Sequence, residues 1–349
     1  MTKTLYPFMD AAFFAALEQS GAVSAEQAWT PCHVQEGDFF LPLYRRMHSW
    51  GEFVFDQGWA QGYERAGLPY YPKLVTAIPY TPVPGPRWRG ELKDARALWQ
   101  QVRESVATQD ASGWHLLFPD DETREALAEL PLVARQACHF RWNNRGYASF
   151  DDFLAALVSR KRKNIRKERA AILQTGLRIE WRQGADIPAQ WWTPFYHCYA
   201  MTYYRRGQQP YLPPAFFRQL ASSSLASQLA LAVAFNGDEM IAAAFYLFDD
   251  SRLYGRYWGS VADVDGLHFE LCYYQGIEFC IRQGLRRFDP GVQGEHKILR
   301  GFEPEITWSL HWLADARFQR AIAQFCEQEA EAVAAYQREA RSLLPYREV

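Results

Sequence analysis

Two apolar segments joined by Asn236-Gly237 constrain the fold more than any other feature of the sequence. LALAVAF precedes this turn and MIAAAFYLF follows it. Asn-Gly between two such segments is the strongest short-range signal for a β-hairpin. A third segment, RLYGRYWGS, follows an Asp-Asp-Ser turn. The sequence therefore predicts three consecutive antiparallel strands.

The segments after these strands predict a helix and a further strand. LHFELCYYQGIEFCIRQG is typical of a helix that ends at Gly284, and the short segment RRFDP follows it. The strands before and after such a helix can lie parallel to each other. ITWSLHWL then predicts the last strand, before a C-terminal helix over residues 314–343. We expect this half of the chain to form a mixed, mostly antiparallel sheet flanked by helices.

The first half of the chain predicts a second α/β segment of similar length. Apolar residues at helical spacing indicate a helix over residues 10–20, and prolines close a strand in KLVTAIPYTPVPGPRW. Further strands are predicted at FFLPLYRRM, EFVFD, WHLLFP and ARQACHFRW, and further helices at residues 93–106 and at DETREALAEL. This half reads as a degenerate copy of the other, so we expect an N-terminal domain at residues 1–148 and a C-terminal domain at residues 149–349.

Composition indicates a globular protein without a strong overall field. Of 349 residues, 48% are hydrophobic and 22% charged, and the formal net charge is −2, so attraction of a polyanion requires a local basic surface. The six cysteines show no CxxC pair and no zinc-like spacing with histidine, which predicts reduced thiols, no metal site and a cytoplasmic location. No stretch approaches the roughly 20 apolar residues of a membrane span, and no export signal is evident.

A run of basic residues opens the second half. Ser149, with Asp152 three residues later, predicts the start of a long helix over residues 150–175 that carries SRKRKNIRKER. One interpretation is a solvated helix face. The other is a phosphate-binding surface for tRNA, coenzyme A (CoA) or a nucleotide-linked or lipid-linked precursor, because near-uniform charge is costly without an anion. The candidate anion-binding residues are Arg160, Arg162, Lys163, Arg166, Lys167 and Arg169.

The loop PGVQGEHKILRGFEP gathers the most chemistry into the fewest residues. Its glycines allow backbone turns that other residues resist. Glu295 and His296 are candidates for a general base toward an amine, and Lys297 and Arg300 are candidates for binding an anion or stabilising an oxyanion. The alternative is a structural turn in which the glutamate and an arginine pair. His311, in TWSLHW, is a further catalytic candidate, with a satisfied core histidine as the alternative.

Other polar residues and rings are candidate substrate-binding groups. In the second half they lie on the third strand of the hairpin region and at the start of the following helix. In the first half they lie around the proline-rich loop, where they could form the facing wall of an interdomain cleft. For each of them the alternative is a core or connecting role. The candidates are His48, Glu52, Asp56, Lys73, Tyr80, Arg87, Tyr257, Trp258, His268 and Glu270.

Several of these segments together resemble one protein family. RYWGS, the helix that follows it, FDPGVQGEHKILRGFEP and TWSLHW are similar to the C-terminal region of the FemAB-like predicted N-acyltransferases, a bacterial branch of the GNAT superfamily associated with peptidoglycan. Residues 48–87 and SRKRKNIRKER resemble other parts of the same family. The resemblance implies tandem GNAT-like acyltransferase domains that transfer an acyl or aminoacyl group to an amine.

The implied donor is aminoacyl-tRNA or acyl-CoA, with no tightly bound cofactor. The strand-to-helix junction GSVADVDGLHFE carries two aspartates where GNAT proteins hold pyrophosphate, which disfavours an ordinary acetyl-CoA mode. The basic helix favours tRNA or an unusual CoA mode. No cysteine lies in the candidate loops, so we expect direct attack by the amine. The rival hypothesis is a non-catalytic module that recognises peptidoglycan precursors or RNA.

Overall fold

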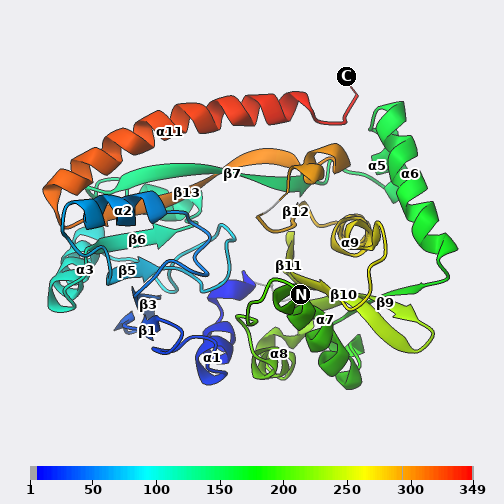
Figure 1. The fold of residues 1–349 in the computed structure, drawn as a ribbon, viewed down its shortest axis with the longest axis horizontal. Helices are drawn as coiled ribbons and strands as arrows, with labels where there is room; N and C mark the ends of the chain where they lie inside the picture. Colours follow the sequence, from blue (N-terminus) through cyan, green and yellow to red (C-terminus); the bar gives the residue numbers. More distant parts are fainter. Residues whose placement is uncertain (1–5, 293, 348–349) are drawn as a thin grey trace. The chain divides into compact units, whose positions relative to one another are not determined.

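The structure is a computed structural model that describes residues 6–292 and 294–347, so Gln293 of the glycine-rich loop lies outside the described residues. The chain divides into two compact units (Figure 1). Unit 1 comprises the described parts of Met1–Ala16, His139–Glu305 and Arg338–Val349, and unit 2 comprises Leu17–Cys138 and Ile306–Gln337. Both units are discontinuous in sequence, whereas the sequence analysis expects two consecutive domains that meet at residues 148 and 149. No described helix is long and apolar enough to cross a bilayer.

Unit 2 contains a mixed, mostly antiparallel sheet of order β1-β4-β5-β6-β13. Only β5 and β6 are parallel, and α3 connects them. A two-stranded hairpin, β2-β3, is separate from this sheet. The elements are β1 (Trp29–Pro31), β2 (Val34–Glu36), β3 (Phe39–Leu41), β4 (Tyr44–Arg46), α2 (Gln57–Arg65), β5 (Lys73–Thr76), α3 (Ala95–Thr108), β6 (Gly113–Leu117), α4 (Asp121–Ala126) and most of β13 (Glu303–Leu313) and α11 (Ala316–Ser342).

Unit 1 contains a second mixed sheet, of order β7-β12-β11-β10-β9-β8. Here β11 and β12 are the parallel pair, and all other neighbours are antiparallel. The elements are most of α1 (Ala11–Gln19), the end of β7 (Val133–Asn143), α5 (Phe150–Ala155), α6 (Ser159–Gln174), β8 (Arg178–Gln183), α7 (Trp192–Tyr204), α8 (Pro214–Ala221), β9 (Leu229–Asn236), β10 (Glu239–Phe248), β11 (Arg252–Ser260), α9 (Leu267–Phe269), a π-helical turn η5 (Glu270–Tyr274), α10 (Gln275–Gln283), β12 (Arg287–Asp289) and a 3-10 turn η6 (Glu295–Arg300).

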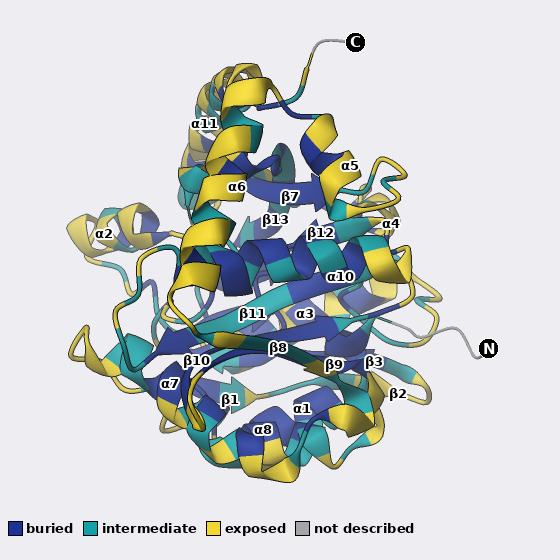
Figure 2. Ribbon diagram, turned by 90° about the vertical axis from the view of Figure 1, so that its right-hand side faces the viewer, coloured by how far each residue is buried: buried dark blue, intermediate teal, exposed yellow. Residues whose placement is uncertain are grey.

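Helices cover both faces of the sheet in unit 1, so its central strands are apolar on both sides. β9 and β10 are buried along almost their whole length (Figure 2). Neighbouring residues of β10 face opposite sides. The ring of Phe245 lies 5.7 Å from that of Phe195 on α7, and the ring of Tyr246 lies 6.1 Å from that of Phe288. Continuous apolar strands such as LALAVAF are the expected result of this arrangement.

The two units repeat one order of elements: an antiparallel pair, a helix and a strand parallel to the second strand of the pair. This confirms the predicted fold class of tandem GNAT-like α/β units. In each unit the next strand of the sheet comes from the other half of the sequence. The end of β7 pairs with β12 in unit 1, and β13 pairs with β6 in unit 2.

The structure corrects two details of the sequence analysis. The predicted long helix is broken into α5 and α6, because the C-terminal segment pairs with the chain between them. Val158 donates its backbone N–H to the carbonyl of Pro345, and Leu157 bridges to Tyr346. The segment EFVFD is not a strand, since Glu52 and Asp56 turn inward toward a buried lysine, and Phe53 adopts a φ of 60°.

Candidate functional site

Two parallel strands separate in unit 1 and leave an opening between them. β11 and β12 pair only over Arg252–Tyr254 and Arg287–Asp289. Pro290 follows and has no N–H with which to continue the ladder. On the other side, Phe245 faces Tyr257 while Tyr246 faces Gly255, so β11 carries one extra residue, Arg256. Such a bulge bends its strand and redirects side chains.

A cavity of about 80 Å³ lies at this opening. Its lining combines β10, the bulged part of β11, the following helix and the residue after β12. Most of the lining residues are aromatic, and several are half-buried. They are Ala244, Phe245, Tyr246, Gly255, Arg256, Tyr257, Trp258, His268, Cys272, Tyr273 and Pro290. Tyr257, Trp258 and His268 are thus brought together, as the sequence analysis predicts for substrate-binding residues.

The helical wall of the cavity contains an irregular turn. Between α9 and α10 the helix passes through η5, a π-helical turn. π-Turns occur frequently at functional sites, because they shift side chains by one residue relative to a regular helix. Here Cys272 and Tyr273 from this turn join His268, five residues earlier, on one wall of the cavity.

A tyrosine-histidine pair connects the cavity to the glycine-rich loop. The hydroxyl of Tyr273 and Nε2 of His296 lie 2.7 Å apart. Burial, followed by the charges of Lys297 and Arg300, lowers the pKa of His296 below its usual value, and burial lowers the pKa of His268 to about 4. Both imidazoles are therefore neutral at neutral pH. A neutral His296 can accept a proton.

Two buried cations follow His296 in η6. Nζ of Lys297 donates to the carbonyl of Gly291 at 2.6 Å, and burial lowers its pKa to about 8. Arg300 pairs with Glu168 at 2.9 Å, and its guanidinium carbon lies 3.5 Å from the centre of the Phe269 ring. Arg300 is thus fixed by an acid on α6. The structural-turn alternative, in which Glu295 pairs with an arginine of its loop, does not describe Arg300, and Glu295 is exposed.

The glycine before this turn is required for two reasons. Gly294 has a φ of 108°, a conformation that other residues rarely adopt. A side chain at Gly294 would also collide with the imidazole of His296. Asp289 fixes the other end of the loop, because its carboxylate accepts from Arg141 at 3.2 Å and from the N–H of Gly291 at 3.1 Å.

The basic residues of α6 fall into two groups. Arg169 pairs with Glu270 at 2.9 Å and with Glu278 at 2.7 Å, and Arg166 pairs with Asp151 at 2.8 Å. Glu270 therefore holds α6 and does not line the cavity. Within the described part of the chain, the remaining candidates form no ion pair, and each is exposed or half-exposed: Arg160, Arg162, Lys163 and Lys167.

The candidates from the first half form a buried ion cluster in unit 2. Lys73, which is 1% exposed, contacts Asp56 and lies 2.7 Å from Glu52, and Arg46 lies 3.1 Å from Glu52. Asp56 and Glu52 raise the pKa of Lys73 against the effect of burial. His48 contacts Arg46 at 3.4 Å. The cluster balances two cations with two acids and, with no opening beside it, fits a structural role best.

Unit 2 closes the position that is open in unit 1. Beyond the paired parts of β5 and β6, Arg87 donates to the carbonyls of Leu117 and Val83 and is 0% exposed. Gly85 bridges to Pro119. The hydroxyl of Tyr80 donates to the carbonyl of Ala22 at 2.9 Å. Arg87 and Tyr80 therefore join backbone segments, and the proline-rich loop fills the place of a ligand.

His311 belongs to unit 2, whereas the loop of His296 belongs to unit 1. Its Nδ1 lies 2.7 Å from Nδ1 of His115, and its Nε2 lies 2.7 Å from the hydroxyl of Ser309. Burial lowers the pKa of both histidines, to about 3 for His115. The core-histidine interpretation of His311 describes these contacts best.

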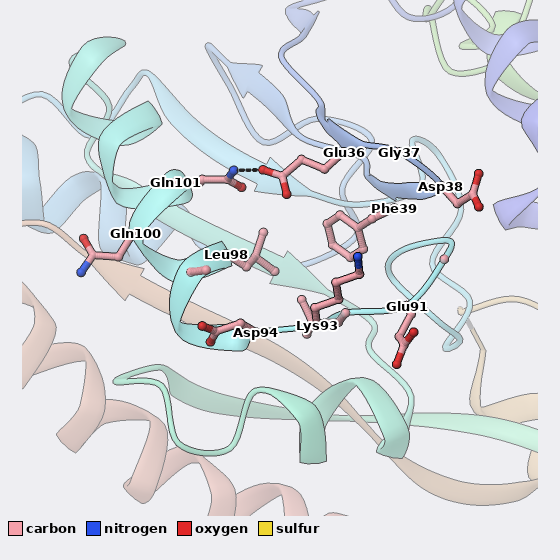
Figure 3. Close-up of a pocket in the computed structure, with 13 residues that line it drawn as sticks. Glu36, Gly37, Asp38, Phe39, Glu91, Lys93, Asp94, Leu98, Gln100 and Gln101 are labelled. Carbon is pink, nitrogen blue, oxygen red and sulfur yellow. Dashed lines mark hydrogen bonds between the residues drawn. The ribbon is translucent and has the colours of Figure 1, made fainter.

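A second, more open cavity of about 900 Å³ lies in unit 2 between the β2-β3 hairpin and α3 (Figure 3). The side chain of Gln101 donates to Glu36 across it. Its charged lining residues are Glu36, Asp38, Glu91, Asp94 and Lys93. The acidic excess opposes a phosphate-bearing carrier, and no candidate residue from the sequence lines this cavity.

The sequence analysis does not identify three residues of the site: Arg256, Tyr273 and Glu168. Arg256 enters the cavity through a bulge, and Tyr273 through a π-turn, and neither irregularity has a clear sequence signal. Glu168 was noted only as the single acid in the basic run. An isolated acid among basic residues is a usable signal for a buried partner elsewhere, here Arg300.

Comparisons with known proteins agree with this fold. The family model for FemAB-like proteins, described as peptidoglycan biosynthesis/recognition, matches residues 1–348. No curated protein sequence matches the chain significantly.

Solved structures with a similar fold share little sequence with this chain. The C-terminal domain of a putative lysylphosphatidylglycerol synthetase from Agrobacterium fabrum is 12% identical with a TM-score of 0.53, over 90% of each chain. L-PGS from Bacillus licheniformis is 9% identical with a TM-score of 0.53, over 92% of this chain and 97% of its own. FemX is 11% identical with a TM-score of 0.51, over 92% of this chain and 96% of its own. These likenesses concern the fold.

Proposed function

The chain belongs to the FemAB-like family of peptidoglycan biosynthesis/recognition proteins, and from this premise we propose that unit 1 is an acyltransferase. It moves an acyl or aminoacyl group from a carrier to an amino group of a small or peptide-like acceptor. The observation that carries the proposal is the Tyr273–His296 pair at a cavity where two parallel strands separate. Unit 2, whose corresponding position is filled by Arg87, has a structural or binding role.

The proposed reaction is direct attack by a free amine. The amine nitrogen forms a bond to the carbonyl carbon of the donor, and the bond from that carbon to the carrier oxygen or sulfur breaks. The amine proton passes to Nδ1 of neutral His296, the Nε2 proton of His296 passes to the oxygen of Tyr273, and the hydroxyl proton of Tyr273 passes to the leaving atom. Burial raises the pKa of Tyr273, so this hydroxyl is protonated before the reaction. Proton exchange with solvent then restores the imidazole tautomer.

Lys297 supplies positive charge beside this proton path. Its pKa of about 8 leaves it largely protonated at neutral pH, and a desolvated cation stabilises developing negative charge better than an exposed one. We assign to it the oxyanion of the tetrahedral intermediate or an anionic group of the donor. Arg300, which is held by Glu168, is a positioning residue for the loop. Glu295 stays a candidate base on the exposed side of His296.

The carrier is proposed to be polyanionic: aminoacyl-tRNA or acyl-CoA. The support is the unpaired basic face of α6, formed by Arg160, Arg162, Lys163 and Lys167. FemX and lysylphosphatidylglycerol synthetase share the fold, and the latter name denotes a synthetase of an aminoacylated lipid. This supports aminoacyl transfer as one form of the reaction.

A transfer assay tests the proposal. The purified protein is incubated with labelled aminoacyl-tRNA or acyl-CoA donors and a panel of amine acceptors that includes peptidoglycan-precursor peptides. We expect a labelled amide product, lost in His296→Ala and retained in His197→Ala, which alters an exposed histidine on α7. Donor or precursor binding without product, and unchanged in His296→Ala, would favour a binding module over the enzyme.

A further inference from the structure

We propose that the cavity between β11 and β12 selects a small acyl group that carries no positive charge. This inference rests on the proposed function and narrows it. A plain acyl group of a few non-hydrogen atoms fits the cavity, whereas a long acyl chain or a group with a free ammonium does not.

The size limit follows from the volume and the walls of the cavity. It has about 80 Å³ of space, and one water in liquid occupies about 30 Å³, so the cavity holds roughly three or four non-hydrogen atoms. The rings of Phe245, Tyr246 and Tyr273 form buried walls, each at most 2% exposed. Close-packed interiors resist expansion by even one methylene group. A longer chain therefore requires displacement of core rings.

The charge preference follows from the groups in and behind the walls. Arg256 lines the cavity through the β11 bulge. Lys297 and Arg300 both act on His268, another lining residue, as positive neighbours. No carboxylate belongs to the lining among residues 6–292 and 294–347. An ammonium on the acyl group would meet positive charge without a compensating acid.

The many rings do not reverse this preference. Aromatic faces attract cations and could bind an ammonium ligand. Here the guanidinium carbon of Arg256 already lies 5.4 Å from the centre of the Tyr257 ring. The protein's own cation therefore occupies part of this aromatic surface, and an incoming ammonium would compete with it.

A matched series of donors on one carrier tests the inference. Acetyl, propionyl, butyryl and hexanoyl groups vary size alone, whereas propionyl and glycyl have equal numbers of non-hydrogen atoms and differ by the ammonium. We expect kcat/KM to fall about tenfold or more from propionyl to hexanoyl, and to be about tenfold higher for propionyl than for protonated glycyl. Equal values within the series would overturn the inference while leaving the transferase proposal intact. Absence of transfer from every donor would remove both.

Variants assign the preference to residues. Arg256→Gln should narrow the difference between propionyl and glycyl, and Trp258→Ala should raise kcat/KM for hexanoyl. Arg252→Gln lies on the same strand but outside the cavity lining, and should leave both ratios unchanged. The wild-type donor series decides the inference even if a variant fails to fold. A folded Arg256→Gln protein with the wild-type ratio would contradict the role given to this arginine.

Discussion

The hydroxyl of Tyr273 lies 2.7 Å from Nε2 of His296, which joins a π-helical turn to a glycine-bounded loop that follows it in sequence. Either atom can be the donor, depending on the tautomer of the imidazole. The pair thus offers a path for a proton between the cavity and the loop, and the first prediction concerns this contact.

Replacing Tyr273 by phenylalanine should lower kcat about 10²-fold or more, because it removes the proton donor for the leaving atom while keeping the ring. Steady-state kinetics of the transfer reaction measure the effect. Tyr204→Phe, on an exposed tyrosine of α7, is the matched control and should retain wild-type kcat. Wild-type turnover in Tyr273→Phe would exclude the proposed proton path.

The pH dependence of kcat/KM should show two limbs. His296 must be neutral, and its pKa is lowered by burial and by Lys297 and Arg300, so activity should fall on the acid side only below the usual histidine value of about 6.5. Lys297 must be charged, and its pKa of about 8 places the alkaline fall near that pH. A pH series of kcat/KM from 5 to 10, flagged here as an approximate range for these two titrations, measures both limbs.

Lys297→Met separates these two limbs. Removing the neighbouring cation favours the protonated imidazole, so the acid limb should move to higher pH, and the alkaline limb near pH 8 should disappear. kcat should also fall, since the oxyanion loses its cation. An acid limb at the wild-type position would show that Lys297 does not influence the titrating base.

Gly294→Ala should reduce turnover more than Gly291→Ala. Both glycines have positive φ, 108° and 89°, so both substitutions strain the backbone. Only the side chain at Gly294 would collide with His296. Comparing kcat and the melting temperature of the two variants separates displacement of the imidazole from general strain. Equal losses of kcat would contradict a specific effect on His296.

Lys73→Met should destabilise unit 2 by about 3–5 kcal/mol, because it leaves Glu52 and Asp56 buried without their shared cation. Urea unfolding measures the free energy. Lys93→Met, on an exposed lysine, should change it by no more than about 0.5 kcal/mol. A Lys73→Met protein as stable as wild type would contradict the structural role assigned to the cluster.

Reversing charge on α6 should weaken donor binding without unfolding the protein. Lys163→Glu combined with Lys167→Glu alters two exposed residues that form no ion pair in the described chain, and should lower tRNA affinity and flatten its salt dependence. Filter binding at two salt concentrations measures this. Arg169→Gln, which leaves Glu270 and Glu278 without their cation, should instead lower the melting temperature.

The apolar pattern predicts most of the fold. The Asn236-Gly237 turn and the segments around it predict β9, β10 and β11, and the helix ending at Gly284 predicts the parallel position of β12. The break between α5 and α6 is not predictable locally, since it depends on pairing of Leu157 with Tyr346, far away in sequence. Tertiary pairing also explains EFVFD, where buried charges outweigh strand propensity.

The site is less predictable than the fold. The chemistry of Gly294 to Arg300 is visible in the sequence, as are Tyr257, Trp258 and His268. Side-chain direction at Arg256 and Tyr273 is set by a bulge and a π-turn, so periodicity misplaces both. Candidates such as Lys73, Arg87 and His311 have the right residue types, but their burial and partners belong to cores, which residue type alone does not reveal.

The reciprocal use of β7 and β13 limits how this protein can be divided. A chain cut between Ala148 and Ser149 would separate unit 2 from its β13 strand and from most of α11, and would leave unit 1 without the end of β7. Neither fragment would carry all the strands of one sheet. The two units are therefore inherited together, and the family can vary its chemistry by substitution in one unit but cannot shed the other by simple truncation.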